Sequence, residues 1–285
     1  MKIFRLIIYL HFFTFFYSPV ISAEFKGEFL QGSFILGKTE ANSKVEIDGR
    51  KVRVDKNGYF VFGLGRDRKN DIVIKIKEKG KLKILKKKVF KREYKIQKID
   101  GLPPKQVTPP PEVYERIKKD NVLIGKARSI DSPYNFFKNK FIYPIDKYII
   151  TGVYGSQRIL NGKPRRPHYG IDFHAPEGTP VKAMMDGEVI LSENDMYFTG
   201  GTLIFDHGHG ISTLYMHMKD INVKVGQKIK QGEIVGTLGQ SGRATGPHLD
   251  IRLNWFDVKL IILQNEVFSY NTITIFIKMN ISFDK

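Results

Sequence analysis

The sequence predicts a mainly β protein, in which a C-terminal antiparallel β-sheet domain follows a small all-β module and a linker helix. Most of the chain consists of short segments of β-forming residues between turn residues, and many of the 26 glycines punctuate the second half. Only one segment, directly after a proline-rich stretch, has helical spacing of apolar residues. A chain of 285 residues is also long enough for two domains with their own cores.

Residues 1–23 have the pattern of a secretory signal peptide. Lys2 and Arg5 precede a long apolar run, and small residues close the segment at Ala23. A retained membrane anchor is the alternative, because the run approaches the length that spans a bilayer. Pro19 favours the cleaved form. In both cases we expect export to the periplasm or cell envelope.

The composition is strongly basic and lacks cysteine. The formal charge is +18, and removal of Lys2 and Arg5 with the signal peptide leaves 18 − 2 = +16. A polyanionic partner suits this charge, such as an anionic membrane or wall surface, although a solvated lysine-rich surface is the simpler alternative. We expect no nucleic-acid partner, because aromatic and basic residues are not interleaved as in nucleic-acid modules. The absence of cysteine excludes disulfides and thiol chemistry.

Residues 24–98 predict a small β-sandwich-like module. Asp48-Gly49 and Asn57-Gly58 are hairpin signals between alternating segments. A third hairpin turning near Gly80 is predicted in IVIKIKEKGKLKILKKKV, with apolar residues on one side and lysines on the other. No catalytic group of residues stands out, so binding or spacing is its expected role.

Residues 99–140 form a linker and a helix. DGLPPKQVTPPP contains five prolines, and Val113, Ile117 and Ile124 then follow at helical spacing after Pro111. Residues 141–260 return to glycine-punctuated strands, which predict the antiparallel sheet. Residues 261–285 contain many β-forming residues without glycine or proline; the open alternatives are an added edge strand, an adhesive tail, or sequence unrelated to the domain's function.

Three stretches of the C-terminal domain carry candidate chemistry. PHYGIDF places His168 and Asp172 four residues apart, and Gly170 permits the bend that lets both reach one ion, although a turn histidine and a capping aspartate would look the same. LYMHM puts His217 on a strand, with Tyr215 on the same face. GPHLD places His248 and Asp250 two residues apart, so that they share a strand face.

This order of motifs resembles the lysostaphin-type, zinc-dependent peptidoglycan endopeptidases, over roughly Pro144 to Trp255. Beyond the three stretches, the segments DFHAPEGTPVKAMMDGEVI, GGTLIFDHGHGISTLYMHM and VKVGQKIKQGEIVGTLGQSGRATGPHL resemble the family in the same order. The resemblance implies a metallopeptidase domain at residues 141–260, one Zn²⁺ per chain, and the peptides of peptidoglycan as substrate.

Carried over to this sequence, the resemblance implies that His168 and Asp172 are metal ligands and that His217 and His248 are catalytic histidines outside the ligand set. Asp250 departs from the family, because it stands where the third ligand is histidine. A carboxylate oxygen lies as far beyond Cβ as Nδ1 of histidine, and zinc accepts carboxylate, so Asp250 is the predicted third ligand.

A second carboxylate makes the metal less positive, which predicts weaker acidification of bound water or acceptance of harder ions. The alternative is a lost ligand and an inactive domain that binds cell wall or activates another wall hydrolase. His207 and His209 form a competing His-x-His pair, but flanking glycines place them in a turn between strands. His174 is either a candidate for supporting the metal ligands from outside the ligand set or a residue of a surface loop. Candidate substrate-binding residues are Arg243, Thr245 and Tyr215, of which Tyr215 lines the cleft or packs in the core.

Overall fold

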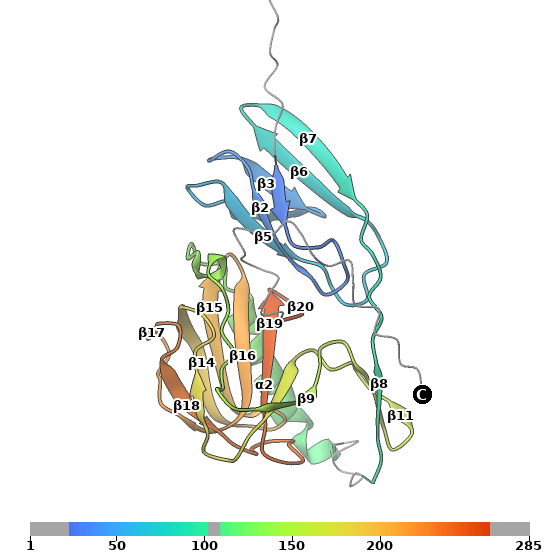
Figure 1. The fold of residues 1–285 in the computed structure, drawn as a ribbon, viewed down its shortest axis with the longest axis vertical. Helices are drawn as coiled ribbons and strands as arrows, with labels where there is room; N and C mark the ends of the chain where they lie inside the picture. Colours follow the sequence, from blue (N-terminus) through green and yellow to red (C-terminus); the bar gives the residue numbers. More distant parts are fainter. Residues whose placement is uncertain (1–22, 102–108, 263–285) are drawn as a thin grey trace, which may run out of the picture.

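The computed structural model describes residues 23–101 and 109–262. The predicted signal peptide, the centre of the linker and nearly all of the predicted tail lie outside these ranges. Figure 1 shows a small β module above a larger β domain that contains the long α2 helix. None of the helices in the described ranges has the length and apolar content needed to cross a membrane.

The N-terminal module consists of two antiparallel sheets, with strand orders β1-β2-β5 and β4-β3-β6-β7. Buried side chains such as Ile35, Phe60, Phe62 and Ile74 belong to the main hydrophobic core. The strands are β1 (Glu24–Lys26), β2 (Phe34–Lys38), β3 (Lys44–Ile47), β4 (Arg50–Val52), β5 (Tyr59–Gly63), β6 (Ile72–Glu78) and β7 (Lys81–Lys87). The all-β prediction for this part of the chain is confirmed.

Two of the three predicted hairpins are confirmed. Asp48-Gly49 joins β3 to β4, and Lys79-Gly80 joins β6 to β7. The hairpin predicted at Asn57-Gly58 is wrong, because the strands on either side of this turn do not pair. β4 pairs with β3, whereas β5 pairs with β2 in the other sheet. The turn itself exists, and the Asp55 carboxylate accepts hydrogen bonds from the Asn57 and Tyr59 N–H groups at 2.8 Å. It therefore directs the chain from one sheet to the other.

The linker contributes one strand and the predicted helix. β8 (Ile96–Ile99) pairs in parallel with β10 (Gln157–Leu160), which pairs with β11 (Lys163–Pro164). A 3₁₀ turn, η1 (Pro111–Val113), leads into α2 (Tyr114–Arg128), and η2 (Phe136–Lys138) follows. Ile124 and Ala127 of α2 pack in a small core with Leu214 and Met216, so the helix covers part of one sheet face.

The C-terminal domain is built on a ten-stranded sheet with the central order β17-β14-β15-β16-β19-β12-β9. All of its pairings are antiparallel, as predicted. Its strands are β9 (Ile149–Gly152), β12 (Ile171–His174), β13 (Pro180–Lys182), β14 (Gly187–Met196), β15 (Gly200–Gly208), β16 (Ile211–Ile221), β17 (Lys228–Ile229), β18 (Ile234–Leu238), β19 (Leu249–Trp255) and β20 (Val258–Leu260).

The two parts of the chain pack together through β20. The Leu260 side chain lies against Gly63, where a Cβ atom would approach it to 2.6 Å, and the Ile261 N–H donates to the Gly32 carbonyl at 2.8 Å. The Arg66 side chain donates to the Gly155 carbonyl at 2.9 Å. The module is therefore fixed against the domain that carries the candidate site.

Candidate metal centre and active site

The candidate site lies where three neighbouring strands, β16, β19 and β12, run side by side. Asp172 on β12 lies directly opposite Asp250 on β19, and Met216, the residue before His217, lies opposite Asp250 on the other side. His168 precedes β12, and its backbone pairs with Gly155 and Ser156 at 2.7 and 2.9 Å. Sheet pairing therefore assembles residues that are 82 positions apart in sequence, from 168 to 250.

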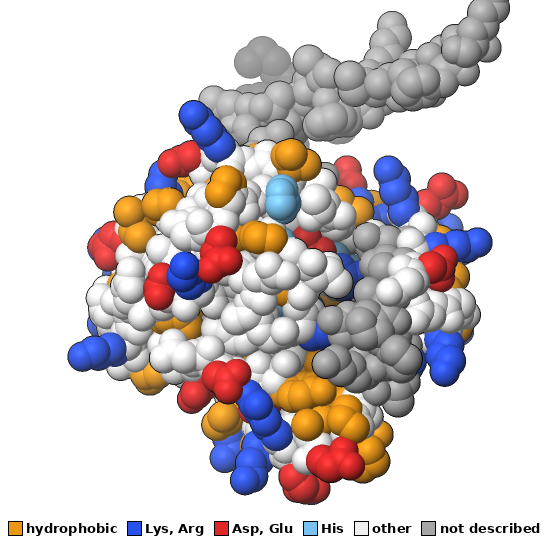
Figure 2. All heavy atoms as spheres, turned by 90° about the horizontal axis from the view of Figure 1, so that it is seen from below, with side chains coloured by type: hydrophobic (Ala, Val, Ile, Leu, Met, Phe, Trp, Pro, Cys, Tyr) orange, Lys and Arg blue, Asp and Glu red, His pale blue; other side chains and the backbone are white. Residues whose placement is uncertain are grey.

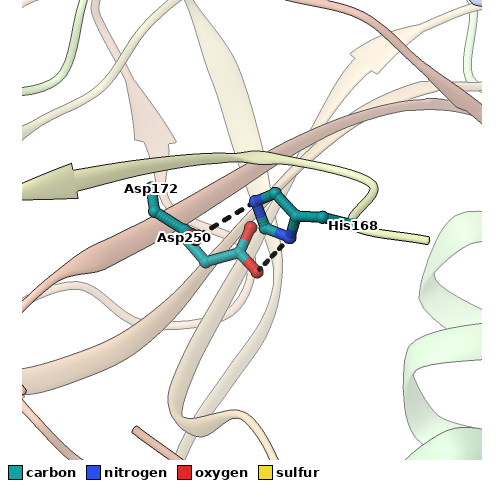
Figure 3. A group of neighbouring side chains, drawn as sticks. All are labelled: His168, Asp172 and Asp250. Carbon is teal, nitrogen blue, oxygen red and sulfur yellow. Dashed lines mark ion pairs between the residues drawn. The ribbon is translucent and has the colours of Figure 1, made fainter. Parts of the chain in front are cut away.

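His168, Asp172 and Asp250 form a buried group, and each offers one ligand atom within 4.8 Å of the others. In Figure 3, dashed lines join the His168 ring to both carboxylates. Its Nε2 lies 3.0 Å from Asp172 Oδ1, and its Nδ1 lies 3.9 Å from Asp250 Oδ2. Two ligands of a tetrahedral zinc ion with bonds of about 2.0 Å stand about 3.3 Å apart. The spacing is therefore that of a site for a small cation.

Two glycines make room for the carboxylates. A Cβ atom at Gly170 would lie 2.1 Å from Asp250 Oδ1, and one at Gly152 would lie 2.1 Å from Asp172 Oδ2. Gly170 was predicted to permit a bend, but its structural reason is this close approach to Asp250. Any side chain at either position would displace a carboxylate from the group.

Three polar atoms of the group are buried without hydrogen bonds within the described ranges. Both ring nitrogens of His168 and Asp172 Oδ1 have no hydrogen-bond partner among the described residues, although Nε2 and Oδ1 are close. His168 is 2% exposed, so bulk water does not supply the missing hydrogen bonds. Buried polar groups are normally paired, and a ligated cation satisfies such atoms. The residues present thus fit a metal ion.

Each carboxylate also has an arginine partner. Arg158 on β10 donates to Asp172 Oδ2 at 2.9 Å. Arg252, two residues beyond Asp250 on β19, donates to both Asp250 oxygens, at 3.3 Å from Nε and 2.8 Å from Nη2. Bidentate pairing fixes the orientation of a carboxylate. The arginines therefore hold Asp172 and Asp250 in place beside His168.

Arg252 also changes the charge of the site. Burial alone would raise the pKa of Asp250, but the charges of Arg252 and His168 outweigh it and hold that pKa well below its usual range. Asp250 is therefore ionised at neutral pH, as a ligand must be. The positive charge of Arg252 offsets the negative charge that aspartate adds relative to histidine. If a metal ion binds here, this pair would reduce the loss of Lewis acidity that two carboxylates cause.

His217 reaches the site through a β-bulge. Met216 and His217 together oppose Thr202, because Leu203 pairs with Tyr215 and Gly201 pairs with Met218. His217 has φ +65°, a left-handed conformation that is uncommon outside glycine. Such a bulge turns a side chain to the other face of the strand.

The predicted common face of His217 and Tyr215 was therefore wrong. Regular alternation would place them together, but the bulge separates them. Tyr215 has no exposed surface, and its hydroxyl accepts a hydrogen bond from the Met184 N–H at 2.8 Å. Tyr215 packs in the core, so its alternative role as a cleft residue does not fit.

A conservative substitution tests this core role. Tyr215→Phe leaves the buried Met184 N–H unpaired, so the free energy of unfolding is expected to fall by about 1–3 kcal/mol. Denaturant unfolding measures this change. Peptide hydrolysis per folded molecule should stay as in the wild type, and a raised KM would contradict a purely structural role.

His217 and His248 form a close pair, with ring centroids 4.6 Å apart. Nδ1 of His217 lies 2.8 Å from the Ser241 carbonyl, and Nδ1 of His248 lies 2.8 Å from the Gly246 carbonyl. A carbonyl only accepts, so each Nδ1 carries hydrogen and each Nε2 keeps its lone pair. Burial, and then the nearby His248, lower the pKa of His217 to about 4, so it is neutral at pH 7.

The other candidate residues lie outside this group. His207 is fully buried, with its ring nitrogens 2.7 Å from the Asp186 carbonyl and from Thr213 Oγ1. His209 packs on the Phe137 ring at 4.8 Å. Neither joins the metal-binding group. The predicted turn contains His209, whereas His207 lies on β15. His174 is exposed, and its Nδ1 lies 2.8 Å from the Pro247 carbonyl.

The two remaining substrate-binding candidates lie on the exposed loop before β19. The Arg243 guanidinium stacks 4.2 Å from the centre of the Phe198 ring. Partial burial, followed by the charges of Arg158 and Arg252, lowers the pKa of Arg243. Thr245 is exposed on the same loop.

Arg158 and Arg252 were missed by reasoning from sequence. The signal for Arg252 was available, because it shares a strand face with Asp250 by the same two-residue spacing that relates His248 to Asp250. No spacing rule relates Arg158 to Asp172, because they belong to different strands that come together only in the fold.

The fold and the buried His-carboxylate group define a β-sheet domain of the metallopeptidase class. Residues 166–260 match the model of Peptidase family M23. The catalytic domain of the antimicrobial peptidase lysostaphin from Staphylococcus simulans is 32% identical, with 40% of this chain and 88% of that chain covered, at a TM-score of 0.36. The chain belongs to peptidase family M23, the lysostaphin-type peptidases, through this domain.

Curated relatives extend the similarity. Peptidoglycan DD-endopeptidase ShyA of Vibrio cholerae is 40% identical over 113 residues, which cover 39% of this chain and 26% of ShyA. Cell division protein DipM of Caulobacter vibrioides is 32% identical over 151 residues, which cover 52% of this chain and 23% of DipM. The chain thus spans only about a quarter of the length of either protein.

One solved structure matches most of the chain. A putative peptidase M23 from Pseudomonas aeruginosa has a TM-score of 0.65 and 24% identity, with 82% of this chain and 92% of that chain covered. At this identity the likeness concerns the fold alone.

Proposed function

We propose that the protein is an exported zinc metalloendopeptidase that hydrolyses the peptide cross-links of peptidoglycan during cell-wall remodelling. The buried group of His168, Asp172 and Asp250 carries this proposal, because both ring nitrogens of His168 and Asp172 Oδ1 lack hydrogen bonds within the described ranges. Similarity to ShyA, a peptidoglycan DD-endopeptidase, supports the substrate. The basic charge and the signal-peptide pattern of residues 1–23 support a location in the cell envelope.

In this proposal His168, Asp172 and Asp250 hold one Zn²⁺, and Arg158 and Arg252 keep the two carboxylates in position. Bound zinc supplies a Lewis acid that polarises the scissile carbonyl and activates water. Ligation also gives a partner to one of the two buried ring nitrogens of His168.

His217 and His248 perform the proton transfers. Because both Nδ1–H groups face backbone carbonyls, each Nε2 is the atom that accepts a proton from water or later returns one to the leaving amine. His217 is neutral at pH 7, so it is ready to act as a base. The protonated form of either ring also stabilises negative charge on the former carbonyl oxygen. Arg243 and Thr245 remain candidate contacts for the substrate.

Chelation tests the proposal. Release of soluble peptides from purified peptidoglycan is expected to fall by a factor of about 10³ or more after zinc removal, because the Lewis acid is lost. One equivalent of zinc should restore it. Peptide release that persists undiminished after verified removal of all metal would contradict the enzyme proposal.

A second candidate function is a metal-free domain that binds wall or activates another hydrolase. The bidentate pair of Arg252 with Asp250 favours it, because this contact satisfies the carboxylate without a metal. This function predicts binding to purified peptidoglycan that is insensitive to chelators, without peptide release. Zinc-dependent cleavage excludes it.

A further inference from the structure

The open face of the second N-terminal sheet is a concentrated basic surface. Residues 72–88, which include the β6–β7 hairpin, contain eight lysines and one glutamate. Figure 1 places the tip of this hairpin at the end of the module farthest from the C-terminal domain. On the face of the molecule seen in Figure 2, by contrast, basic and acidic side chains are interspersed. The excess of lysine in this hairpin therefore concentrates positive charge on the second sheet of the module.

Strand register shows which side chains share the open face. Ile72, Ile74 and Ile76 of β6 are fully buried, so the residues between them point outward. One outward row crosses the sheet as Lys51, Glu46, Lys75 and Ile84, the next as Lys44, Lys77 and Leu82, and a third as Val73 and Lys86. These nine residues, termed the basic face, carry five lysines and one glutamate, which gives 5 − 1 = +4.

Two large apolar side chains lie among these lysines. Leu82 is 58% exposed and Ile84 is 59% exposed, and both belong to β7, the edge strand of the sheet. Lysines on an edge strand discourage pairing with another chain. That protective role explains the lysines but not an outward leucine and isoleucine beside them. Exposed apolar groups within a cationic surface are typical of elements that lie at a membrane interface.

We propose that the basic face docks the protein on an anionic lipid bilayer, with Leu82 and Ile84 entering the interface and the lysines binding phosphate headgroups. Charge complementarity argues for an anionic partner. The apolar pair argues for a bilayer over a wall polymer, because a hydrated polyanion offers no apolar region to receive it. Docking here keeps the candidate active site, in the other domain, free for substrate. The proposal does not depend on the peptidase activity.

Sedimentation with vesicles tests the proposal. The full chain is mixed with vesicles of phosphatidylcholine alone or of phosphatidylcholine with phosphatidylglycerol, and the ratio of the two affinities is measured. Any apolar contribution from residues 1–23 affects both vesicle types, so the ratio isolates the charged contact. The wild type is expected to prefer anionic vesicles by at least about tenfold, and added salt should reduce this preference.

Variants locate the contact. Lys44→Gln with Lys77→Gln should lower affinity for anionic vesicles about 25-fold, because each surface lysine contributes about fivefold. Leu82→Ser with Ile84→Ser should lower it about tenfold without changing the melting temperature, since both side chains are exposed. The matched control, Lys118→Gln with Lys119→Gln on the exposed face of α2, removes the same charge and should bind as the wild type.

Three outcomes would overturn the proposal. The first is equal wild-type affinity for both vesicle types. The second is an equal loss in the control variant, which would show a response to net charge alone. The third is binding to purified peptidoglycan without binding to vesicles, which would identify the wall polymer as the partner of the basic face.

Discussion

Asp250→Ala is expected to lower hydrolysis of purified peptidoglycan by a factor on the order of 10³ or more. The substitution removes one of three proposed ligands and leaves Arg252 without its partner, so positive charge replaces a ligand beside the metal site. Initial rates of peptide release measure the effect. Asp257→Ala provides the control, because Asp257 is an exposed aspartate beyond the same strand and its change should leave the rate intact. Full activity of Asp250→Ala would contradict the assignment of Asp250.

The pairing of Asp250 with Arg252 makes a second substitution informative. Asp250→His restores the residue type of the lysostaphin-type family but leaves the Arg252 charge uncompensated near the metal. We expect its rate to be about 10- to 100-fold below that of the wild type. Mutations of residues that hydrogen-bond to metal ligands have effects of this size. Adding Arg252→Met to Asp250→His removes this charge and should raise the rate of the variant about tenfold. If Arg252→Met gives no recovery, Arg252 does not compensate Asp250.

His217→Ala is expected to lower the rate of peptide release by a factor of about 10²–10⁴ while zinc remains bound. Its ring is close to His248 and outside the ligand group, so its loss removes a proton acceptor and not a ligand. Paired measurements of zinc content and rate separate these roles. His174→Ala, a substitution at an exposed histidine of the same domain, should change neither quantity. Loss of zinc from His217→Ala would instead make His217 a ligand.

Local patterns predicted the strand content and the linker helix well, because apolar alternation and turn residues report on short segments. They predicted strand partners only where a tight hairpin joins neighbouring strands, as for β3 with β4 and β6 with β7. Asn57-Gly58 marks a real turn, but a turn signal specifies a reversal of the chain and not which strand pairs next. The parallel pairing of β8 with β10 likewise joins segments about 60 residues apart, and neither segment carries a signal for the other.

The sequence predicted which residues form the candidate site, but it did not predict how they are arranged. The resemblance implied this ligand set but no strand pairing, and His168, Asp172 and Asp250 come together because β12 and β19 are neighbours. The position of Tyr215 could not be obtained from alternation, since the bulge at His217 resets the two-residue period. Arg158 could not be connected to Asp172 by spacing, because tertiary folding alone places its strand beside the carboxylate.

The zinc content of the purified chain tests the central claim most directly. The claim is that Asp250, held by Arg252, completes a metal site with His168 and Asp172. After removal of loosely bound ions, elemental analysis is expected to find about one zinc per wild-type chain and almost none in Asp250→Ala. A wild-type chain that retains no metal at neutral pH, or an Asp250→Ala chain that retains as much zinc as the wild type, would contradict the claim.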